Sequence, residues 1–189
     1  LEETLNVLGD GHHTFLKDIS KSSDIDSPMS EISDRFSTAP SIAVNAAGIT
    51  RDSFLLKQDE KSFDEVINVN LKGTFLITKA VAQKMVDSNI TNGSIINFAS
   101  LAGKVGNMGQ ANYSASKGAV ISLSKTAAKE LAQFGIRCNV ILPGFIDTPM
   151  TSTIPDRVTQ MIQFMTPLGR PGKPEEVAHA CLFLADRKS

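Results

Sequence analysis

Strand-like and helix-like segments alternate along this chain, and this alternation limits the possible folds more than any other feature of the sequence. Short apolar or β-branched runs have the length of buried strands: residues 13–19, 41–44, 94–97 and 136–142. Between and after them, apolar residues recur at helical spacing: residues 27–36, 63–86, 113–134, 155–165 and 174–184. Such alternation favours parallel strands joined by crossover helices that cover both faces of the sheet. We therefore predict an α/β fold with a doubly wound parallel sheet, in one domain over residues 1–189.

The composition excludes several classes of protein. The chain carries 19 basic and 20 acidic side chains, so we expect no nucleic-acid partner, which would normally require a basic excess. No apolar run approaches the roughly 18 residues that a membrane span needs, so we expect none. The chain has two distant cysteines and three histidines, of which His12 and His13 are adjacent, so we expect neither a disulfide framework nor a metal site.

Tyr113 is the only tyrosine of the chain, and Lys117 follows it at a spacing that puts both side chains on one helix face. A phenol titrates near 10, and lowering its pKa to about 7 takes roughly 4 kcal/mol. An ammonium about 5 Å away supplies roughly 3 kcal/mol at an effective dielectric constant of about 20, and a bound cationic ring could add the rest. The pair is a candidate proton donor and acceptor, although a solvated surface pair has the same spacing.

Two further polar residues lie where they could assist this pair. Ser100 follows the strand at 94–97, and a glycine-rich loop between it and Tyr113 could bring its hydroxyl to the helix start. There it could bond to a substrate carbonyl oxygen, although a lone serine at this position is more often a turn or cap residue. Asn70 lies inside the helix at 63–86, close to Gly73. It is either a tolerated polar residue or the mark of a distortion that frees a backbone carbonyl to hold a water.

Small and turn-forming residues follow two of the predicted strands. The strand at 41–44 leads into Asn45, Ala46, Ala47 and Gly48, and Pro143 with Gly144 stops the strand at 136–142. Small residues let the backbone approach a flat ligand closely, although this run could also be simple turn chemistry. In a doubly wound sheet, ligands lie at the carboxyl ends of the strands, so we expect the ligand here.

Taken together and in this order, Asn45–Gly48, Asn70, Ser100, Tyr113 with Lys117, and Pro143-Gly144 resemble the short-chain dehydrogenase/reductase family. The resemblance covers essentially the whole chain and implies a Rossmann-like sheet. Within the family, the chain is most similar to the 3-oxoacyl-[acyl-carrier-protein] reductases and the 17-beta-hydroxysteroid dehydrogenases of type 8. This implies an NAD(P)-dependent oxidoreductase, with NAD favoured, that interconverts a secondary alcohol and a ketone by hydride transfer. The implied substrates are 3-oxoacyl thioesters and 17-hydroxy or 17-keto steroids.

The resemblance also implies a role for each candidate residue. Tyr113 would be the catalytic acid and base, and Ser100 would orient and polarise the carbonyl. Lys117 would lower the pKa of Tyr113 and bind the nicotinamide ribose, and Asn70 would hold a proton-relaying water. The remaining residues would line the adenine, ribose and carboxamide of the cofactor: Asp18, Ile19, Asn45, Ala46, Ala47, Gly48, Pro143, Gly144, Ile146 and Thr148. Residues 151–165 would form a mobile substrate lid.

Family features that this sequence lacks lead to a further expectation. Neither the Gly-rich pyrophosphate loop with its βαβ unit nor the final strand of the family is present in the sequence. We therefore expect a domain truncated at both ends that binds cofactor poorly as written. Ala99 also stands where the family often has a second serine.

The family also implies an assembly and a location. The helices at 63–86 and 113–134 would pair across subunits in a homo- or heterotetramer, and the location would be the mitochondrial matrix or otherwise the cytoplasm. The alternative to an active enzyme is an inactive fragment or a structural subunit of a hetero-oligomeric reductase. An epimerase or dehydratase that uses the same Tyr/Lys pair would need a larger substrate domain.

Overall fold

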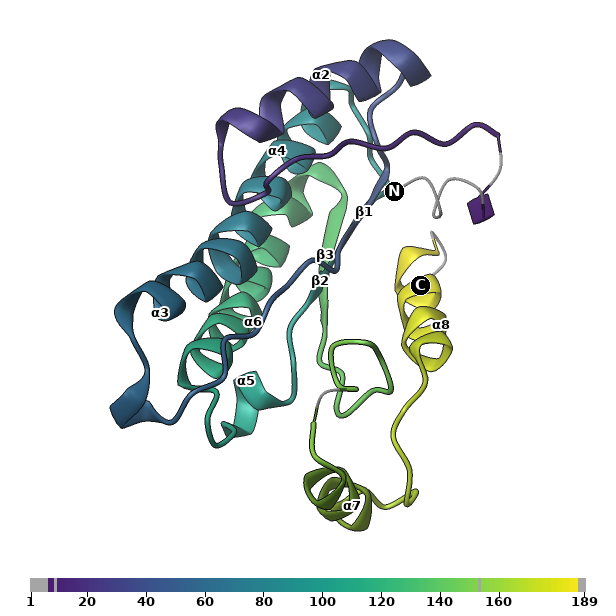
Figure 1. Cartoon of the computed structure of the whole chain (residues 1–189). Coiled ribbons are helices and arrows are strands. Elements are labelled where there is room, and N and C mark those ends of the chain that lie inside the picture. Colours follow the sequence, from purple (N-terminus) through teal and green to yellow (C-terminus); the bar gives the residue numbers. More distant parts are fainter. Residues whose placement is uncertain (1–6, 9, 153, 187–189) are drawn as a thin grey trace.

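The computed structural model describes residues 7–8, 10–152 and 154–186, which form a parallel sheet with helices on both faces (Figure 1). The strands are β1 (Ile42–Asn45), β2 (Gly93–Phe98) and β3 (Ile136–Ile141), in the order β1-β2-β3. Both pairings are parallel, with Asn45 opposite Asn97 and Ile95 opposite Cys138. The carboxyl ends of all three strands therefore meet at one edge of the sheet. This confirms the predicted α/β class.

The helices form two layers around the sheet (Figure 1). One layer contains α2 (Ser23–Phe36), α4 (Thr74–Asp87) and α6 (Ala111–Leu131), and the other face carries α8 (Pro174–Ala185). The remaining helical elements are α3 (Glu60–Ile67), α5 (Ala102–Val105), α7 (Asp156–Met165) and the short turns η1 (Leu55–Lys57), η2 (Asn68–Gly73) and η3 (Ala132–Phe134). Apart from shifts at their ends, the longer helices agree with the predicted segments, whereas α5 and η1 lie outside every predicted segment.

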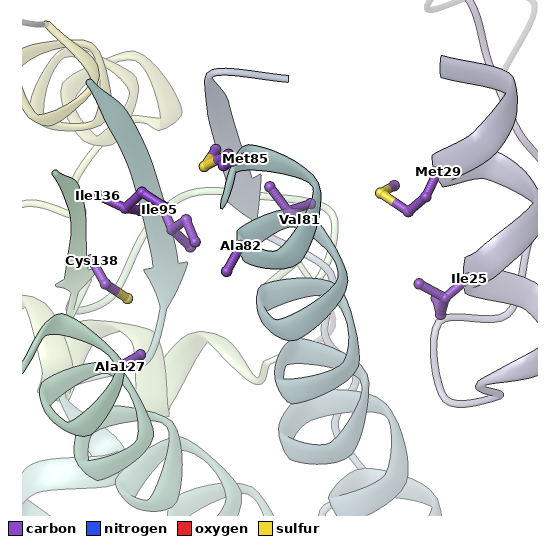
Figure 2. Packing of buried hydrophobic residues seen from close by; sticks show 9 residues of the cluster. All are labelled: Ile25, Met29, Val81, Ala82, Met85, Ile95, Ala127, Ile136 and Cys138. Carbon is purple, nitrogen blue, oxygen red and sulfur yellow. The ribbon is translucent and has the colours of Figure 1, made fainter. Parts of the chain in front are cut away.

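One hydrophobic core joins the sheet to the first helix layer (Figure 2). It contains residues from α2, α4, α6, β2 and β3: Ile25, Met29, Val81, Ala82, Met85, Ile95, Ala127, Ile136 and Cys138. Met85 and Ile95 are completely buried. Because burying one such side chain stabilises the fold by about 1.5–3 kcal/mol, this cluster fixes α4 and α6 against the strands whose ends form the site.

The predicted strand at residues 13–19 is wrong. The chain is extended there but pairs with no strand of the described part of the sheet. The His13 ring of this segment contacts helix α2 instead, 3.0 Å from the Glu31 carboxylate, and it packs edge-on against Phe15 of the segment itself. Leu16 is 88% exposed, so the apolar run that suggested a buried strand is not buried.

The predicted helix at 63–86 forms, with a π-helical turn inside it. α3 leads into η2, a π-helix from Asn68 to Gly73, and η2 leads into α4. This confirms the local distortion expected around Asn70. Gly73 allows the turn to pack closely, because a Cβ there would lie 2.8 Å from the Ile19 side chain.

Helix α8 is anchored at its C-terminal end by the amino ends of two strands. The hydroxyl of Ser94 and the guanidinium of Arg137 both donate to the carbonyl oxygen of Leu184, each at 2.9 Å. Arg137 also donates to the carbonyl oxygen of Asp186 at 2.8 Å. These bonds satisfy carbonyl groups that a helix end leaves without intrahelical partners, and they hold α8 over the sheet.

Within the ranges given above, none of the helices has both the length and the apolar character that a bilayer crossing requires.

Candidate active site

A cavity of about 800 Å³ lies at the carboxyl ends of the strands, between the sheet and α8. Its lining includes most of the residues predicted from sequence: Ala46, Gly48, Ser100, Tyr113, Lys117, Pro143, Gly144, Ile146 and Thr148. These residues come from the loops after β1, β2 and β3 and from the first turns of α6. The topology of the parallel sheet thus brings together residues about 100 positions apart.

Two glycines set how closely the Ser100 loop approaches α6. A Cβ on Gly103 would lie 2.6 Å from the backbone of Lys117 and Gly118, and one on Gly118 would lie 2.9 Å from the Gly103 carbonyl oxygen. Only glycine at both positions permits this contact. It keeps the loop after β2 directly against the turn of α6 that carries Lys117.

Ser100, Tyr113 and Lys117 share one wall of the cavity. The Ser100 hydroxyl accepts a hydrogen bond from the Ala102 amide at 3.2 Å, which orients it at the end of β2. The Nζ of Lys117 donates to the Phe98 carbonyl oxygen at 2.7 Å and lies 5.9 Å from the centre of the Tyr113 ring. Two hydroxyl groups and one ammonium group therefore face the same space.

The pKa of Tyr113 differs from the sequence-based expectation. Burial raises the pKa of its phenol above the ordinary value, the nearby Ser100 hydroxyl lowers it, and the Asp52 carboxylate raises it further. The expected lowering by Lys117 is absent among the groups of the described chain that act on this phenol. Burial lowers the pKa of the Lys117 amine to about 8, so this amine is already uncharged at the pH at which the phenol loses its proton.

Asn70 lies behind the cavity wall and is fully buried. Its side-chain amide binds both backbone groups of Ile49, at 2.8 and 3.0 Å, and donates to Ser116 at 3.1 Å. Its backbone carbonyl accepts the Thr74 hydroxyl at 2.7 Å. A Cβ on Gly48 would lie 3.3 Å from both Asn70 Oδ1 and Lys117 Nζ, so these two polar groups flank the loop after β1.

Four of the predicted cofactor residues lie outside the cavity lining: Asp18, Ile19, Asn45 and Ala47. The Asn45 amide points beneath the site, toward Thr78 and Asn97. Asp18 is exposed in the turn before α2, where its carboxylate accepts from the amide and hydroxyl of Ser20 at 3.0 and 2.7 Å. The Ile19 side chain packs against Gly73.

The sequence interpretation missed one whole wall of the cavity, which α8 supplies. Its residues there follow a single helical face: Pro174, Val177, Ala178, Cys181, Leu182 and Ala185. Helical periodicity could have identified this apolar face. The local sequence does not show which part of the fold the face packs toward. Residues of the loop at 149–151 also line this cavity and precede the predicted lid helix.

The predicted lid segment borders a second, smaller space. A cavity of about 450 Å³ lies between the loop after β3 and the segment at 162–170, and it shares Gly144 and Ile146 with the larger one. Apolar side chains dominate its lining, among them Leu101, Ile162 and Met165. Arg170 and Glu176 at its rim form an ion pair of 2.7 Å. The two cavities thus lie on either side of the Gly144 loop.

A metal site would require several ligating side chains close together. Among the residues with described positions, no three His, Cys, Asp or Glu side chains gather closely enough to hold a metal ion.

Comparison with known proteins agrees with this arrangement. The sequence profile described as "Enoyl-(Acyl carrier protein) reductase" matches residues 2–189. The "(3R)-3-hydroxyacyl-CoA dehydrogenase" of Canis lupus familiaris is 50% identical over 181 residues, which is 96% of this chain and 70% of that protein. The chain belongs to the short-chain dehydrogenase/reductase family.

Other relatives in this family have related names. The "3-oxoacyl-[acyl-carrier-protein] reductase FabG" of Thermotoga maritima is 51% identical over 148 residues, covering 78% of this chain and 59% of that protein. The "Estradiol 17-beta-dehydrogenase 8" of Callithrix jacchus is 57% identical over 127 residues, covering 67% of this chain and 94% of that protein. The resemblance stated from the motifs is confirmed. The chain is an oxidoreductase of a family that uses NAD(P) and acts on hydroxyl and keto groups.

Proposed function

We propose that this protein interconverts 3-hydroxyacyl and 3-oxoacyl thioesters with NAD as cofactor, and that 17-beta-hydroxysteroids are a second substrate class. The observation that carries the proposal is the shared wall on which Ser100, Tyr113 and Lys117 face one cavity. The names of the mammalian and bacterial relatives support the substrate classes. The likeness to the hydroxysteroid dehydrogenases supports NAD over NADP.

The cavity fits a nicotinamide cofactor. It lies at the carboxyl ends of parallel strands, and a Cβ at position 48 would crowd Asn70 and Lys117. The loop after β1 reaches the cavity through Ala46 and Gly48. In this proposal these two residues line the ribose side, and the loop after β3 holds the carboxamide through Pro143, Gly144, Ile146 and Thr148. When bound, the nicotinamide supplies the acceptor or donor of the hydride.

The three polar side chains divide the proton chemistry in this proposal. The Ser100 hydroxyl donates a hydrogen bond to the substrate oxygen and stabilises negative charge that develops on it. In reduction the Tyr113 hydroxyl gives its proton to that oxygen, and in oxidation the Tyr113 phenolate takes the proton of the alcohol. Lys117, on the same wall of the cavity, binds the nicotinamide ribose. The buried Asn70, in the π-helical turn, fits the role of holding a water behind Lys117.

We propose that residues 1–189 form a single domain, and that the location is the mitochondrial matrix, by similarity to the mammalian relatives. We also propose a tetramer that pairs through the faces of α4 and α6. A groove of about 630 Å³ between these helices supports it, since Phe75, Leu123 and Phe134 line that groove and both phenylalanines are more than 40% exposed.

The decisive experiment replaces Tyr113 with Phe and follows NADH at 340 nm with a 3-oxoacyl thioester and with estradiol plus NAD. We expect the variant to lose nearly all turnover while it still binds NADH, because only the proton-transferring hydroxyl is removed. Turnover close to that of the wild type would overturn the assignment. If the wild type is inactive alone but active when mixed with a second reductase chain, the structural-subunit alternative replaces the proposal.

A further inference from the structure

The fully buried Asn97 joins four elements directly beneath the cavity. Its Oδ1 accepts from the Asn45 amide of β1 at 2.8 Å and from the Thr78 hydroxyl of α4 at 3.3 Å. Its Nδ2 donates to the Ser124 hydroxyl of α6 at 2.9 Å and lies 3.8 Å from the Cys138 sulfur of β3. An amide in an apolar core is stable only when it is bonded in this way, so these contacts fix the distances between the elements.

Two contacts join neighbouring residues of β2 to a single face of α6. Ser124 follows Lys117 by seven residues, which is two helical turns, so both side chains lie on the same face of α6. Ser124 binds Asn97, and Lys117 binds the carbonyl oxygen of the next residue, Phe98, at 2.7 Å. The Ser124 hydroxyl is itself held by the Val120 carbonyl oxygen at 2.8 Å. The position of α6 along β2 therefore depends on these two bonds.

Thr78 provides the matching contact on a helix that carries none of the cavity-lining hydroxyl or ammonium groups. Its hydroxyl binds Asn97 Oδ1 and also accepts from the Asn45 amide at 3.1 Å. Thr78 is 5% exposed and Ser124 is 1% exposed, so both hydroxyls are buried and bound to the same amide. They differ in the helix that they hold in place.

We propose that Asn97 and Ser124 are positioning residues that fix where Lys117 and Tyr113 of α6 lie relative to the carboxyl end of β2. The inference rests on the proposed function, since it concerns the geometry of that same site. Neither residue lines the cavity, so neither would touch the reacting groups directly.

The test compares Ser124→Ala with Thr78→Val, because replacing Asn97 itself would leave buried partners on several elements unpaired. Each variant deletes one buried hydroxyl bound to Asn97. We expect Ser124→Ala to lower kcat about tenfold and to move the pH midpoint of kcat, because small misplacements of catalytic groups cost 10–100-fold in rate. We expect Thr78→Val to keep kcat within about twofold and to keep the pH midpoint, although it removes the same number of hydrogen bonds, two.

Stability is measured in parallel by urea denaturation, since a merely structural contact would change stability and leave the pH profile unmoved. Equal losses of kcat in both variants, or an unchanged pH profile in Ser124→Ala, would overturn the positioning role. Tyr113→Phe is assayed beside them, so that failure of the proposed function can be distinguished from failure of the positioning role. Full activity in Tyr113→Phe overturns the proposed function and this inference together. An inactive Tyr113→Phe with equal Ser124 and Thr78 effects overturns only the inference.

Discussion

The Nζ atom of Lys117 donates a 2.7 Å hydrogen bond to the carbonyl oxygen of Phe98, and the lysine side chain is almost fully buried. Burial lowers the pKa of this amine from 10.5 to about 8. The described ion pairs all involve other residues, so the ammonium group is held by a neutral carbonyl oxygen and not by a carboxylate. A charge in this position destabilises the folded state at neutral pH.

Replacing Lys117 with Met should abolish turnover, because Lys117 belongs to the proposed active site. The same change removes the buried charge and should therefore raise the free energy of unfolding at pH 7. From the lowered pKa, the upper bound on this gain is about 3 kcal/mol. Between about pH 8 and pH 10.5 the unfolded chain binds more protons at Lys117 than the folded chain, so wild-type stability rises with pH relative to the variant. Urea denaturation of both proteins between pH 7 and pH 10 measures this. A difference in unfolding free energy between the two proteins that stays constant with pH would contradict the lowered pKa of Lys117.

Asp52 should tune the pH dependence of alcohol oxidation. Its carboxylate accepts from the Gln110 side chain at 3.0 and 3.2 Å and raises the pKa of the Tyr113 phenol. In Asp52→Asn that pKa falls, so we expect the rise of kcat with pH to move to lower pH. Asp64→Asn, at an exposed position of α3, is the control and should leave the profile in place. Identical profiles for the wild type and Asp52→Asn would refute this electrostatic effect.

Removing the Ser100 hydroxyl should slow the chemical step without unfolding the protein. Loss of one hydrogen-bond donor to a developing oxyanion costs about 10²–10³ in kcat, and we expect this range for Ser100→Ala. Ser114→Ala is the matched control, because the buried Ser114 hydroxyl has no hydrogen-bond partner among the described residues. Steady-state kinetics with a 3-oxoacyl thioester distinguish the two. Equal kcat values in both variants would remove Ser100 from the proposed mechanism.

Gly135, between η3 and β3, should be the least replaceable glycine for stability. It has a φ of +70°, and a Cβ there would lie 2.3 Å from the Thr91 carbonyl oxygen. We expect Gly135→Ala to lower the free energy of unfolding by more than about 2 kcal/mol, since the left-handed backbone alone costs roughly 1–2 kcal/mol. Gly169 has a φ of +65° and nothing within 4 Å of its Cβ position, so Gly169→Ala isolates the backbone contribution. Equal denaturation midpoints for the two variants would contradict the steric argument.

Part of the site that the sequence predicts is set by local periodicity. The spacing of Tyr113 and Lys117 places both residues along one face of α6, and both line the cavity. The π-helical turn at Asn70 follows from a weak helical stretch that ends in Gly73. Each of these features depends on residues within about two turns of one another.

The parts that the sequence misjudges depend on distant neighbours. Residues 13–19 have the composition of a strand, but a strand also needs an adjacent edge to pair with, and this segment contacts α2 instead. The pKa of Tyr113 depends on burial and on Asp52, both of which are set by the folded loops. The cavity-facing side of α8 is periodic in sequence, but its orientation is decided by Ser94 and Arg137 at its far end.

The wall formed by α8 is separate from the turn of α6 and the strand end that supply the hydroxyl and ammonium groups. Side chains such as Val177 and Leu182 can therefore change in size while the proton-handling apparatus stays intact. Substitutions accumulated along this one helix during evolution can therefore change which ligand is preferred while the catalytic residues are kept. A single scaffold of this type can then diversify into several enzymes that share one reaction.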